Sequence, residues 1–403
     1  MDGTDTVSEE LRAEVQAWVG EHLPGKFRDA VAPGSLALLA DIDAEAAAAW
    51  YAALGERGYT VPHWPREHGG LGYSEQQAAV VRSVLVEQGA GLPDHYFVPL
   101  MLIGPAIMAW GTPEQQRTYL PGIVAGAGMW CQLFSEPGAG SDLASLATRA
   151  VPEDGRAWRV NGQKVWSSFA TESRYGMLLA RTDPDQPKNA GITCFLVDMT
   201  APGVTVRPLR QLTGDEHFCE VFLEDLMLGP ETVLGPVNEG WRVAMTTLNA
   251  ERSGLSETSS ASGYPLQPVL ELARRTGRWR DPLVRDRLTD LFVTEHALAL
   301  TNLRSVAESR TSGGSPTGSI TKLVLSELSQ EISELGFELG AAQAAYWDDV
   351  MPPETHALLD SRRFTIAGGT SEVQRNIVGE RVLGLEREID PGRGKPWREL
   401  RRG

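Results

Sequence analysis

The first third of the chain has apolar residues at the three- and four-residue spacing of helices that bury one face. This spacing predicts helices over residues 9–19, 44–56, 76–88 and 99–110, separated by glycine- and proline-rich segments. Pro113, followed by Glu114, is typical of the first turn of a further helix. We therefore expect a helical domain over residues 1–128.

The pattern then changes to short apolar runs separated by turn residues. Asn161-Gly162 favours a type I′ turn, so residues 158–166 are predicted to form a hairpin. Further strands are expected over residues 191–199, 203–209 and 220–228. Their spacing predicts a central β domain, a sandwich or barrel, over residues 129–236.

Helical periodicity returns after Gly240. Long helices are expected over residues 241–254, 282–309, 319–348 and 371–383, with the Ser/Gly/Pro-rich segment 311–319 connecting two of them. Four long helices predict a C-terminal four-helix bundle over residues 237–403. The predicted fold class is therefore α+β, with a β domain between two helical domains.

Composition and charge limit the partners. No uncharged apolar run approaches the length of a membrane span, and the acidic amino terminus lacks the apolar segment of a signal peptide, so we expect a cytoplasmic protein without a membrane partner. The net charge of −16 disfavours nucleic acid. Cys131, Cys194 and Cys219 fit neither a disulfide framework nor metal-ligand spacing, so no metal is expected.

Residues 241–255 contain the first candidate for chemistry. At helical spacing Glu251 falls within an apolar stripe formed by Trp241, Ala244, Met245, Leu248 and Leu255. Burial raises the pKa of a carboxyl group and the neighbouring Arg252 would lower it, which is how a general base is poised near neutral pH. A structural Glu-Arg ion pair fits the same residues.

Two glycine-containing segments are candidate ligand loops. Residues 133–142 follow an apolar strand, and Gly138 and Gly140 there let the backbone approach a ligand closely. At residues 367–372 we expect Ser371 to cap a helix in a box with Gln374, whose C-terminal end is at Gly384, leaving an anion site at the helix start. A plain turn and an ordinary capped helix are the alternatives.

Three motifs, SEPGAGSD at 135–142, VNGQKVW at 160–166 and GGTSEVQRN at 368–376, resemble those of the flavin-dependent acyl-CoA dehydrogenase family over essentially the whole chain. The resemblance implies bound FAD, an acyl-CoA substrate, an electron-transfer flavoprotein or other acceptor, and a homo-oligomer, dimer or tetramer, with FAD at a subunit interface. By position, the FAD contacts correspond to Leu133, Ser135, Ser141, Trp166, Ser168, Thr370 and Glu372. Arg252 and Ser141 correspond to substrate-side positions.

Many family members carry the catalytic glutamate where this chain has Gly368. In the isovaleryl- and long-chain-type branch the base precedes the helix arginine, which is Glu251 here. The resemblance therefore implies that Glu251 removes the α proton while the β hydrogen leaves as hydride to flavin N5, giving the 2-enoyl-CoA. The backbone N–H of Gly368 would stabilise the thioester oxygen.

Two departures from the family pattern affect the FAD site. The R-x-x-F-G stretch is absent from residues 274–287, and a Gly-Gly segment is replaced by LGAAQA at 339–344. Some bacterial relatives, including those that degrade steroid side chains, form mixed tetramers. A half-site or non-catalytic subunit of such a heteromer is therefore one alternative, and a flavin oxidase or monooxygenase of the same fold is another.

Overall fold

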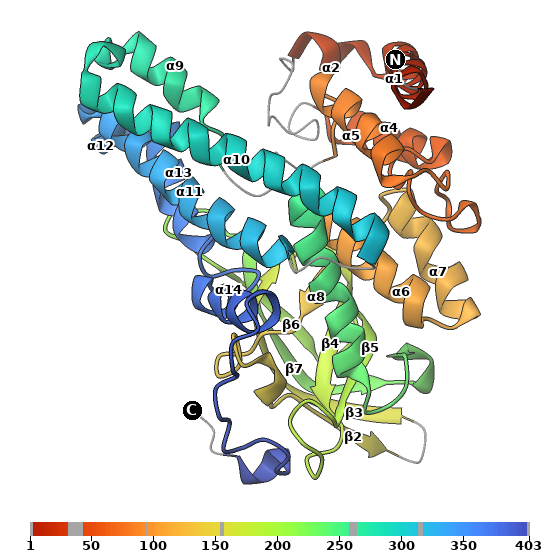
Figure 1. Ribbon diagram of the computed structural model, residues 1–403. Coiled ribbons are helices and arrows are strands. Elements are labelled where there is room, and N and C mark those ends of the chain that lie inside the picture. Colours follow the sequence, from red (N-terminus) through yellow and green to blue (C-terminus); the bar gives the residue numbers. More distant parts are fainter. Residues whose placement is uncertain are drawn as a thin grey trace. The chain divides into compact units, whose positions relative to one another are not determined.

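A computed structural model describes residues 3–30, 43–92, 96–153, 157–257, 264–312 and 317–400, with side chains throughout except at 3–7, 28–30, 249–257, 305–312 and 317. The chain divides into two compact units, drawn together in Figure 1. The first unit comprises residues 1–208, 217–247 and 394–403, and the second comprises residues 209–216 and 248–393. The domain boundaries expected after residues 128 and 236 stay a prediction.

The first unit begins with helices, as the apolar spacing predicts. They are α1 (Gly3–His22), α2 (Gly25–Ala30), α4 (Ala44–Arg57), α5 (Glu75–Glu87), a π-helix (Val98–Ile103), α6 (Gly104–Trp110) and α7 (Pro113–Val124). Pro113 occupies the first turn of α7 as predicted, and Thr112 caps it in a box with Gln115. Their buried faces include Trp50 and Leu54, each at most 1% exposed.

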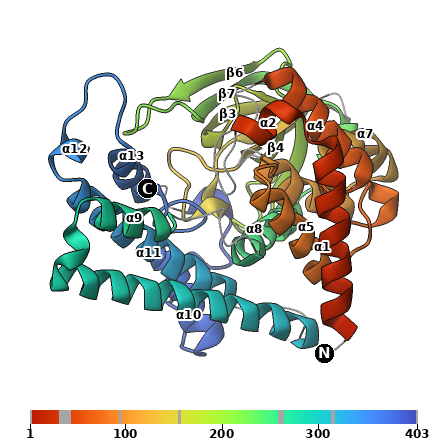
Figure 2. The ribbon, with the colours of Figure 1, turned by 90° about the horizontal axis from the view of Figure 1, so that it is seen from above.

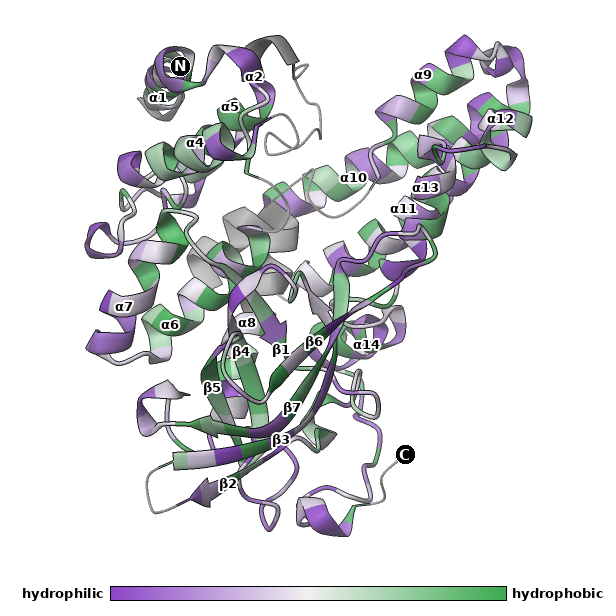
Figure 3. Cartoon of the chain, turned by 180° about the vertical axis from the view of Figure 1, so that it is seen from behind, coloured by the Kyte–Doolittle hydropathy of each residue, from purple (hydrophilic) through white to green (hydrophobic). Residues whose placement is uncertain are grey.

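A mixed sheet completes the first unit. Its strands are β1 (Met129–Leu133), β2 (Arg149–Glu153), β3 (Ala157–Ser168), β4 (Ser173–Arg181), β5 (Ile192–Asp198), β6 (Val204–Leu209), β7 (Phe218–Leu228) and β8 (Val233–Leu234). The order is β6-β7-β3-β2-β4-β5-β8, and β1 runs parallel to β4. Figure 3 shows hydrophobic residues concentrated along β4 and β5, which pair antiparallel and are buried over nearly their whole length.

The hairpin predicted at Asn161-Gly162 is wrong, because β3 continues through both residues. The Asn161 side chain instead bridges to β7: its Nδ2 donates to Asp225 Oδ1 at 3.1 Å, and the Asp225 amide donates back to Asn161 Oδ1 at 2.9 Å. Asp225 has a φ of 49° where the β3–β7 register shifts. The motif therefore marks a β-bulge rather than a turn.

Gly162 is required by close packing. A Cβ at this position would lie 2.3 Å from Thr148 Oγ1 and 2.7 Å from Thr148 Cα, so only glycine lets the Thr148 backbone come this close. Thr148 is 1% exposed, and it ends the loop that follows β1.

The second unit is helical. It contains α9 (Gln267–Arg275), α10 (Pro282–Ser312), α11 (Thr317–Gly340), α12 (Ala342–Ala345), α13 (Pro353–Asp360), α14 (Ser371–Ile377) and a π-helix (Val378–Val382). Figure 2 shows α10 alongside α11. Their core, shared with α9, is aliphatic, including Leu272, Leu288, Leu328, Ile332 and Leu335. None of the described helices is long and apolar enough to cross a membrane.

Two helix predictions differ from the structure. The helix expected over 319–348 ends at Gly340, because Ala341 has a φ of 49°, a conformation that interrupts a right-handed helix. Helix α9 was not expected from the sequence. The connector predicted at 311–319 lies partly outside the described residues, since 313–316 are not described.

We predict that Gly162→Ala destabilises the protein by about 1–3 kcal/mol, because the added methyl group must displace the Thr148 backbone. Urea unfolding measures this change. Gly138→Ala is the matched control, since a Cβ at Gly138 meets nothing within 4 Å. Equal unfolding midpoints for the two variants would refute the packing argument.

Candidate functional site

The loop after β1 is held against β3. The Leu133 side chain is fully buried in the sheet core, so a ligand contact from Leu133 would come from its backbone. The carbonyl of Ser135 accepts a hydrogen bond from the Val165 amide at 2.9 Å, and Glu136 exchanges backbone hydrogen bonds of 3.1 and 3.0 Å with Ala139. The structure therefore brings Ser135 together with the strand that carries Trp166 and Ser168.

The tip of this loop leaves backbone donors available. Gly138, Gly140 and Ser141 are exposed, and a Cβ at either glycine would meet no atom within 4 Å. Their three amides donate to no acceptor in the described part of the chain. A run of free amides on an exposed glycine-rich loop suits a phosphate or a polar ring edge.

A buried ion pair fixes both ends of the loop. Lys164 Nζ donates to Glu136 Oε1 at 2.8 Å and to the Phe134 carbonyl at 3.0 Å, and the Lys164 side chain has no exposed surface. The Glu136 carboxylate also accepts from the amides of Ala147 at 2.6 Å and Thr148 at 2.9 Å. One carboxylate therefore joins the start of the loop, its end and β3.

The charges of this pair follow from its surroundings. Burial raises the pKa of the Glu136 carboxyl, but the Lys164 ammonium and the hydrogen bonds from Thr148 and Ala147 outweigh burial and hold this pKa below its usual range. For Lys164 burial dominates and lowers the pKa of the ammonium, although Glu136 opposes the shift. Neither residue was predicted from the sequence to belong to the site, although Glu136 stands inside the motif at 135–142 and Lys164 inside the motif at 160–166.

Trp166 is presented to solvent by a β-bulge. Between Lys164 and Ser167 the β3–β7 register shifts, and Trp166 there has a φ of 62°. Its side chain is 62% exposed and meets Phe218 only at the ring edge, with centroids 6.2 Å apart. A strained residue that exposes a flat aromatic face is a typical feature of a ligand site. Ser168, two residues on, is half-buried.

In the second unit, Gly368 and Gly369 have φ values of 64° and 89°. Their amides and that of Thr370 donate to no acceptor in the described segments. The predicted cap at Ser371 is wrong by one residue: Thr370 caps α14 and accepts from the Val373 amide at 3.2 Å. The reason is that Thr370 has the extended conformation of a cap, whereas Ser371 is already helical.

The predicted box with Gln374 is therefore also wrong, and Gln374 has another partner. Its Nε2 donates to the Gly368 carbonyl at 3.0 Å, which orients the peptide after Gly368. Gln374 Oε1 and Ser371 Oγ are buried and find no hydrogen-bond partner in the described residues. Gly384 has the positive φ, 69°, expected just beyond a helix end.

Glu372 points to solvent in the first turn of α14. Its own backbone amide and the Thr370 hydroxyl lower the pKa of its carboxyl group. Glu372 is therefore ionised at the helix start, where a negative charge is favourable.

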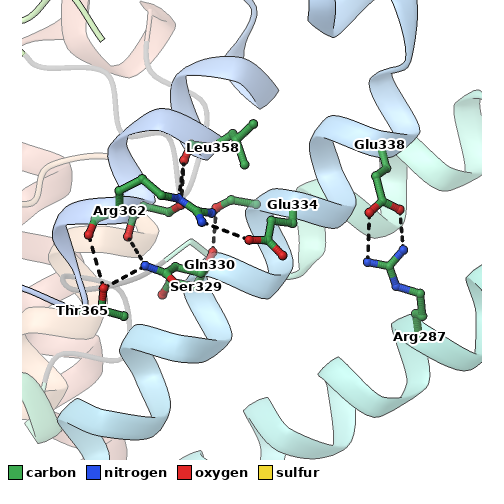
Figure 4. Close-up of polar contacts among 10 residues, drawn as sticks. Arg287, Ser329, Gln330, Glu334, Glu338, Leu358, Arg362 and Thr365 are labelled. Carbon is green, nitrogen blue, oxygen red and sulfur yellow. Dashed lines mark hydrogen bonds and ion pairs between the residues drawn. The ribbon is translucent and has the colours of Figure 1, made fainter. Parts of the chain in front are cut away.

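A polar network holds the segment before Gly368 onto α11. Figure 4 shows Arg362 reaching Glu334 at 3.0 Å and the Leu358 carbonyl at 3.1 Å, while Gln330 donates to Thr365 Oγ1 at 3.0 Å. Lys322 also donates to the Phe364 carbonyl. These contacts fix the chain just before the free amides at 368–370.

Helix α8 (Gly240–Glu257) begins one residue before and ends three residues after the predicted range 241–254, and the described part of the predicted apolar stripe is only partly buried. Val243, Ala244 and Thr247 are buried, while Trp241, Met245 and Leu248 are half-buried. The side chains of Glu251 and Arg252 lie outside the described residues, so their roles stay predictions.

Where the family pattern has an FAD-binding arginine, two of the arginines at 274–287 have other contacts within this chain, while Arg275, Arg280 and Arg285 are exposed. Arg274 lies over the Trp279 ring at 5.5 Å, and Arg287 pairs with Glu338. Figure 4 shows the Arg287–Glu338 pair between α10 and α11. The R-x-x-F-G stretch is absent from residues 274–287, and Arg287 in this segment forms an ion pair within the chain instead.

Comparison with protein families gives three matches in chain order. The acyl-CoA dehydrogenase N-terminal domain matches residues 7–127, the middle domain residues 131–226 and the C-terminal domain residues 238–383.

Comparison with individual proteins agrees. The acyl-CoA dehydrogenase IpdE1 of Mycobacterium tuberculosis is 39% identical over 387 residues, covering 94% of this chain and 98% of IpdE1. The acyl-CoA dehydrogenase FadE34 of the same organism is 41% identical over 341 residues, 83% of this chain but 46% of FadE34. The solved structure of the Tcur3481-Tcur3483 steroid ACAD matches with a TM-score of 0.78 at 28% identity, covering 95% of this chain and 98% of that one.

We predict that Lys164→Met costs about 3–5 kcal/mol of stability at neutral pH, because the Glu136 carboxylate stays buried without its counter-ion. The wild-type carboxylate contributes stability that is present above its unfolded pKa, roughly 4.3, and is lost as the pH falls through its lower folded pKa. Removing Lys164 raises that folded pKa, so acid unfolding should begin at a higher pH. Urea unfolding across a pH series measures both effects.

Lys26→Met is the matched control for this variant, because Lys26 pairs with Asp43 at an exposed position. Its unfolding curve should nearly overlay that of the wild type. Equal losses in the two lysine variants would contradict the proposed role of the buried pair.

The described residues fit a flavin nucleotide. In the first unit, the amides of Gly138, Gly140 and Ser141 have no acceptor in the described residues and can donate to phosphate or ring oxygens, and Trp166 offers an exposed aromatic face. In the second unit, the amides at 368–370 can donate likewise. Enzymes with these domains depend on FAD. The domain order, the fold and the similarity to IpdE1 over nearly its full length lead to one conclusion: the chain belongs to the acyl-CoA dehydrogenase family.

Proposed function

We propose that this chain catalyses the FAD-dependent α,β-dehydrogenation of a bulky acyl-CoA thioester, with Glu251 as the base. The main supporting observation is the amide of Gly368, which stands at the position where many relatives carry the catalytic glutamate, has a positive φ and donates to no acceptor in the described residues. A backbone donor survives the loss of that side chain. The base must then come from another element, and the predicted one is helix α8.

In this proposal, two groups of the chain act on the substrate at the thioester. The Gly368 N–H donates to the thioester oxygen and stabilises the negative charge that develops as the α carbon loses its proton. Glu251 accepts that proton. Arg252, the next residue on α8, lies toward the thioester end in this assignment. FAD, when bound, accepts the hydride from the β carbon.

The residues of the first unit hold the cofactor in this proposal. The amides around Gly138, Gly140 and Ser141 donate to polar groups of the flavin nucleotide, and Ser135, Ser141 and Ser168 add hydroxyls. Trp166 packs its exposed ring against the isoalloxazine. In the second unit, we assign Thr370, the cap of α14, and the ionised Glu372 in its first turn to FAD contacts.

The proposed substrate class follows from the absence of a side chain at residue 368. Glycine there leaves space beside the thioester that a glutamate side chain fills in relatives. An acyl group that carries a steroid ring system is rigid and bulky, and the structural relative Tcur3481-Tcur3483 is named a steroid ACAD. We therefore assign a polycyclic or branched acyl-CoA as substrate, with an electron-transfer flavoprotein as the electron acceptor.

The assembly is assigned as a heteromer with a homologous chain. The name Tcur3481-Tcur3483 joins two proteins, and the R-x-x-F-G arginine is absent from this chain while Arg287 is paired with Glu338. A homologue that supplies the missing phosphate contact would complete the FAD site. The homotetramer expected from the family resemblance is the alternative.

The test is co-purified flavin followed by anaerobic reduction. The chain should carry stoichiometric FAD, either alone or when co-expressed with a homologue, and the flavin absorbance should bleach on addition of acyl-CoA. Fast reaction of the reduced flavin with oxygen would instead favour an oxidase or monooxygenase. Protein that stays colourless with and without a homologous partner would overturn the proposal.

For the acyl group, we predict that steroid-derived and branched acyl-CoAs bleach the flavin faster than straight short-chain acyl-CoAs at equal concentration, because Gly368 leaves space near the thioester. Rates from anaerobic stopped-flow mixing provide the measurement. Free CoA is the control and should leave the flavin oxidised. Faster bleaching by short straight chains would refute the pocket argument.

For the base, we predict that Glu251→Gln lowers the flavin reduction rate by roughly 10²- to 10⁴-fold, because the amide cannot accept the α proton. FAD content and melting temperature should stay close to the wild-type values. The matched control is Glu239→Gln, just before α8, where an exposed carboxylate pairs with Arg242. A Glu251→Gln enzyme that is unstable but fully active in its folded fraction would identify Glu251 as a structural partner of Arg252 instead.

A further inference from the structure

The C-terminal segment, residues 394–400, returns to the first unit and packs beneath the loop that we assign to FAD. Trp397 is only 5% exposed. Its amide donates to the Gln186 carbonyl at 2.8 Å, and the next amide, of Arg398, donates to the Pro184 carbonyl at 3.2 Å. The segment is therefore docked by its backbone and by one large side chain.

The Trp397 ring contacts the turn that directly follows Ser141. Its Nε1 donates to the Ser145 carbonyl at 3.2 Å. The Trp397 ring also contacts Arg181, whose guanidinium carbon lies over the ring, 4.9 Å from its centre. An indole beneath a guanidinium is a favourable cation–π arrangement, and it is stronger when both groups are buried.

Arg181 binds the same turn from the end of β4. It is 1% exposed, and its Nη2 donates to the carbonyls of Ala144 at 2.6 Å and Leu146 at 3.4 Å. Its Nη1 donates to the Lys188 carbonyl at 2.8 Å. Carbonyls 144, 145 and 146 are therefore all bound by Arg181 and Trp397.

The same turn is tied to Lys188 through Asp142. Ser145 Oγ and Lys188 Nζ donate to the Asp142 carboxylate at 2.6 and 2.9 Å, and both lower the pKa of that carboxyl group. The amides assigned to the ligand are those of Gly138, Gly140 and Ser141, and the last of them directly precedes Asp142. Their position therefore depends on the turn that Arg181 and Trp397 hold.

We infer that Arg181 and Trp397 are positioning residues for FAD, and that docking of the C-terminal segment and FAD binding stabilise each other. This inference rests on the proposed assignment of the 133–142 loop to FAD. Coupling between two binding events is reciprocal, so removing the Trp397 contact weakens FAD binding and bound FAD strengthens the docking of residues 394–400.

The first test compares FAD affinity in full-length variants. Trp397→Ala should raise the FAD dissociation constant by roughly 5- to 100-fold, the usual range of such coupling. Trp397→Phe keeps a ring beneath Arg181 but loses the Nε1 hydrogen bond, so its effect should be intermediate. The control is Trp110→Ala in α6, which also removes an indole that lies beneath an arginine, Arg242, and that donates an Nε1 hydrogen bond, to Thr246. Its FAD affinity should equal that of the wild type.

The second test needs no substitution. Hydrogen–deuterium exchange of the wild-type protein with and without FAD should show slower exchange in both the 138–146 and the 394–400 peptides. Protection of 138–146 alone would refute the coupling while leaving the loop assignment in place. Protection of neither would remove the loop assignment and this inference together. Wild-type FAD affinity in a folded Trp397→Ala protein would also overturn the inference.

Discussion

The geometry of the proposed cofactor loop depends on one buried carboxylate. Glu136 binds the Lys164 ammonium and two backbone amides, so it joins three segments of chain at a position almost without solvent. Burying two charges is unfavourable unless their remaining hydrogen-bonding groups are satisfied, and here the Phe134 carbonyl and the two amides satisfy them. These hydrogen bonds involve only residues near the two ends of the loop. The amides of Gly138, Gly140 and Ser141 at its tip therefore take no part in them and can donate to a ligand.

The second unit shows the same arrangement, in which the residues that anchor a segment are hydrogen-bonded and the amides that follow them have no acceptor in the described residues. Arg362, Gln330 and Lys322 bind the chain before Gly368, and Gln374 binds the Gly368 carbonyl. The amides at 368–370 are left as donors. Trp166, at the bulge in β3, has a left-handed backbone conformation that is strained for a residue with a side chain, whereas Gly368 adopts a similar φ without strain.

Sequence patterns predicted the parts of the fold that depend on local spacing. Helix α8 was predicted nearly to its ends, because a 3.6-residue period over eighteen positions leaves little ambiguity. The Asn161-Gly162 prediction was wrong because turn propensity depends only on local sequence. The requirement for glycine at 162 comes instead from the close approach of Thr148, which directly precedes β2. The cap of α14 was misplaced by one residue because adjacent Thr370 and Ser371 are both good caps.

The contacts that position the candidate site could not be predicted in this way. Lys164 and Glu136 are 28 residues apart, and Trp397 and Ser145 are 252 residues apart, so no periodicity joins them. Family motifs marked the residues that we assign to ligand contacts. The motifs contain Glu136 and Lys164, but that these two side chains pair, and that Trp397 binds Ser145, is defined only by the folded backbone.

Proton transfer from the α carbon to Glu251 is the central claim, and it can be measured apart from flavin reduction. A bulky acyl-CoA with sulfur in place of its β carbon cannot be dehydrogenated, but its α hydrogens can exchange with D₂O on the enzyme. The wild-type holoenzyme should wash these hydrogens out, and Glu251→Gln holoenzyme should be slower by the roughly 10²- to 10⁴-fold expected for loss of a general base. Exchange at the wild-type rate in Glu251→Gln would contradict the assignment of Glu251 as the base.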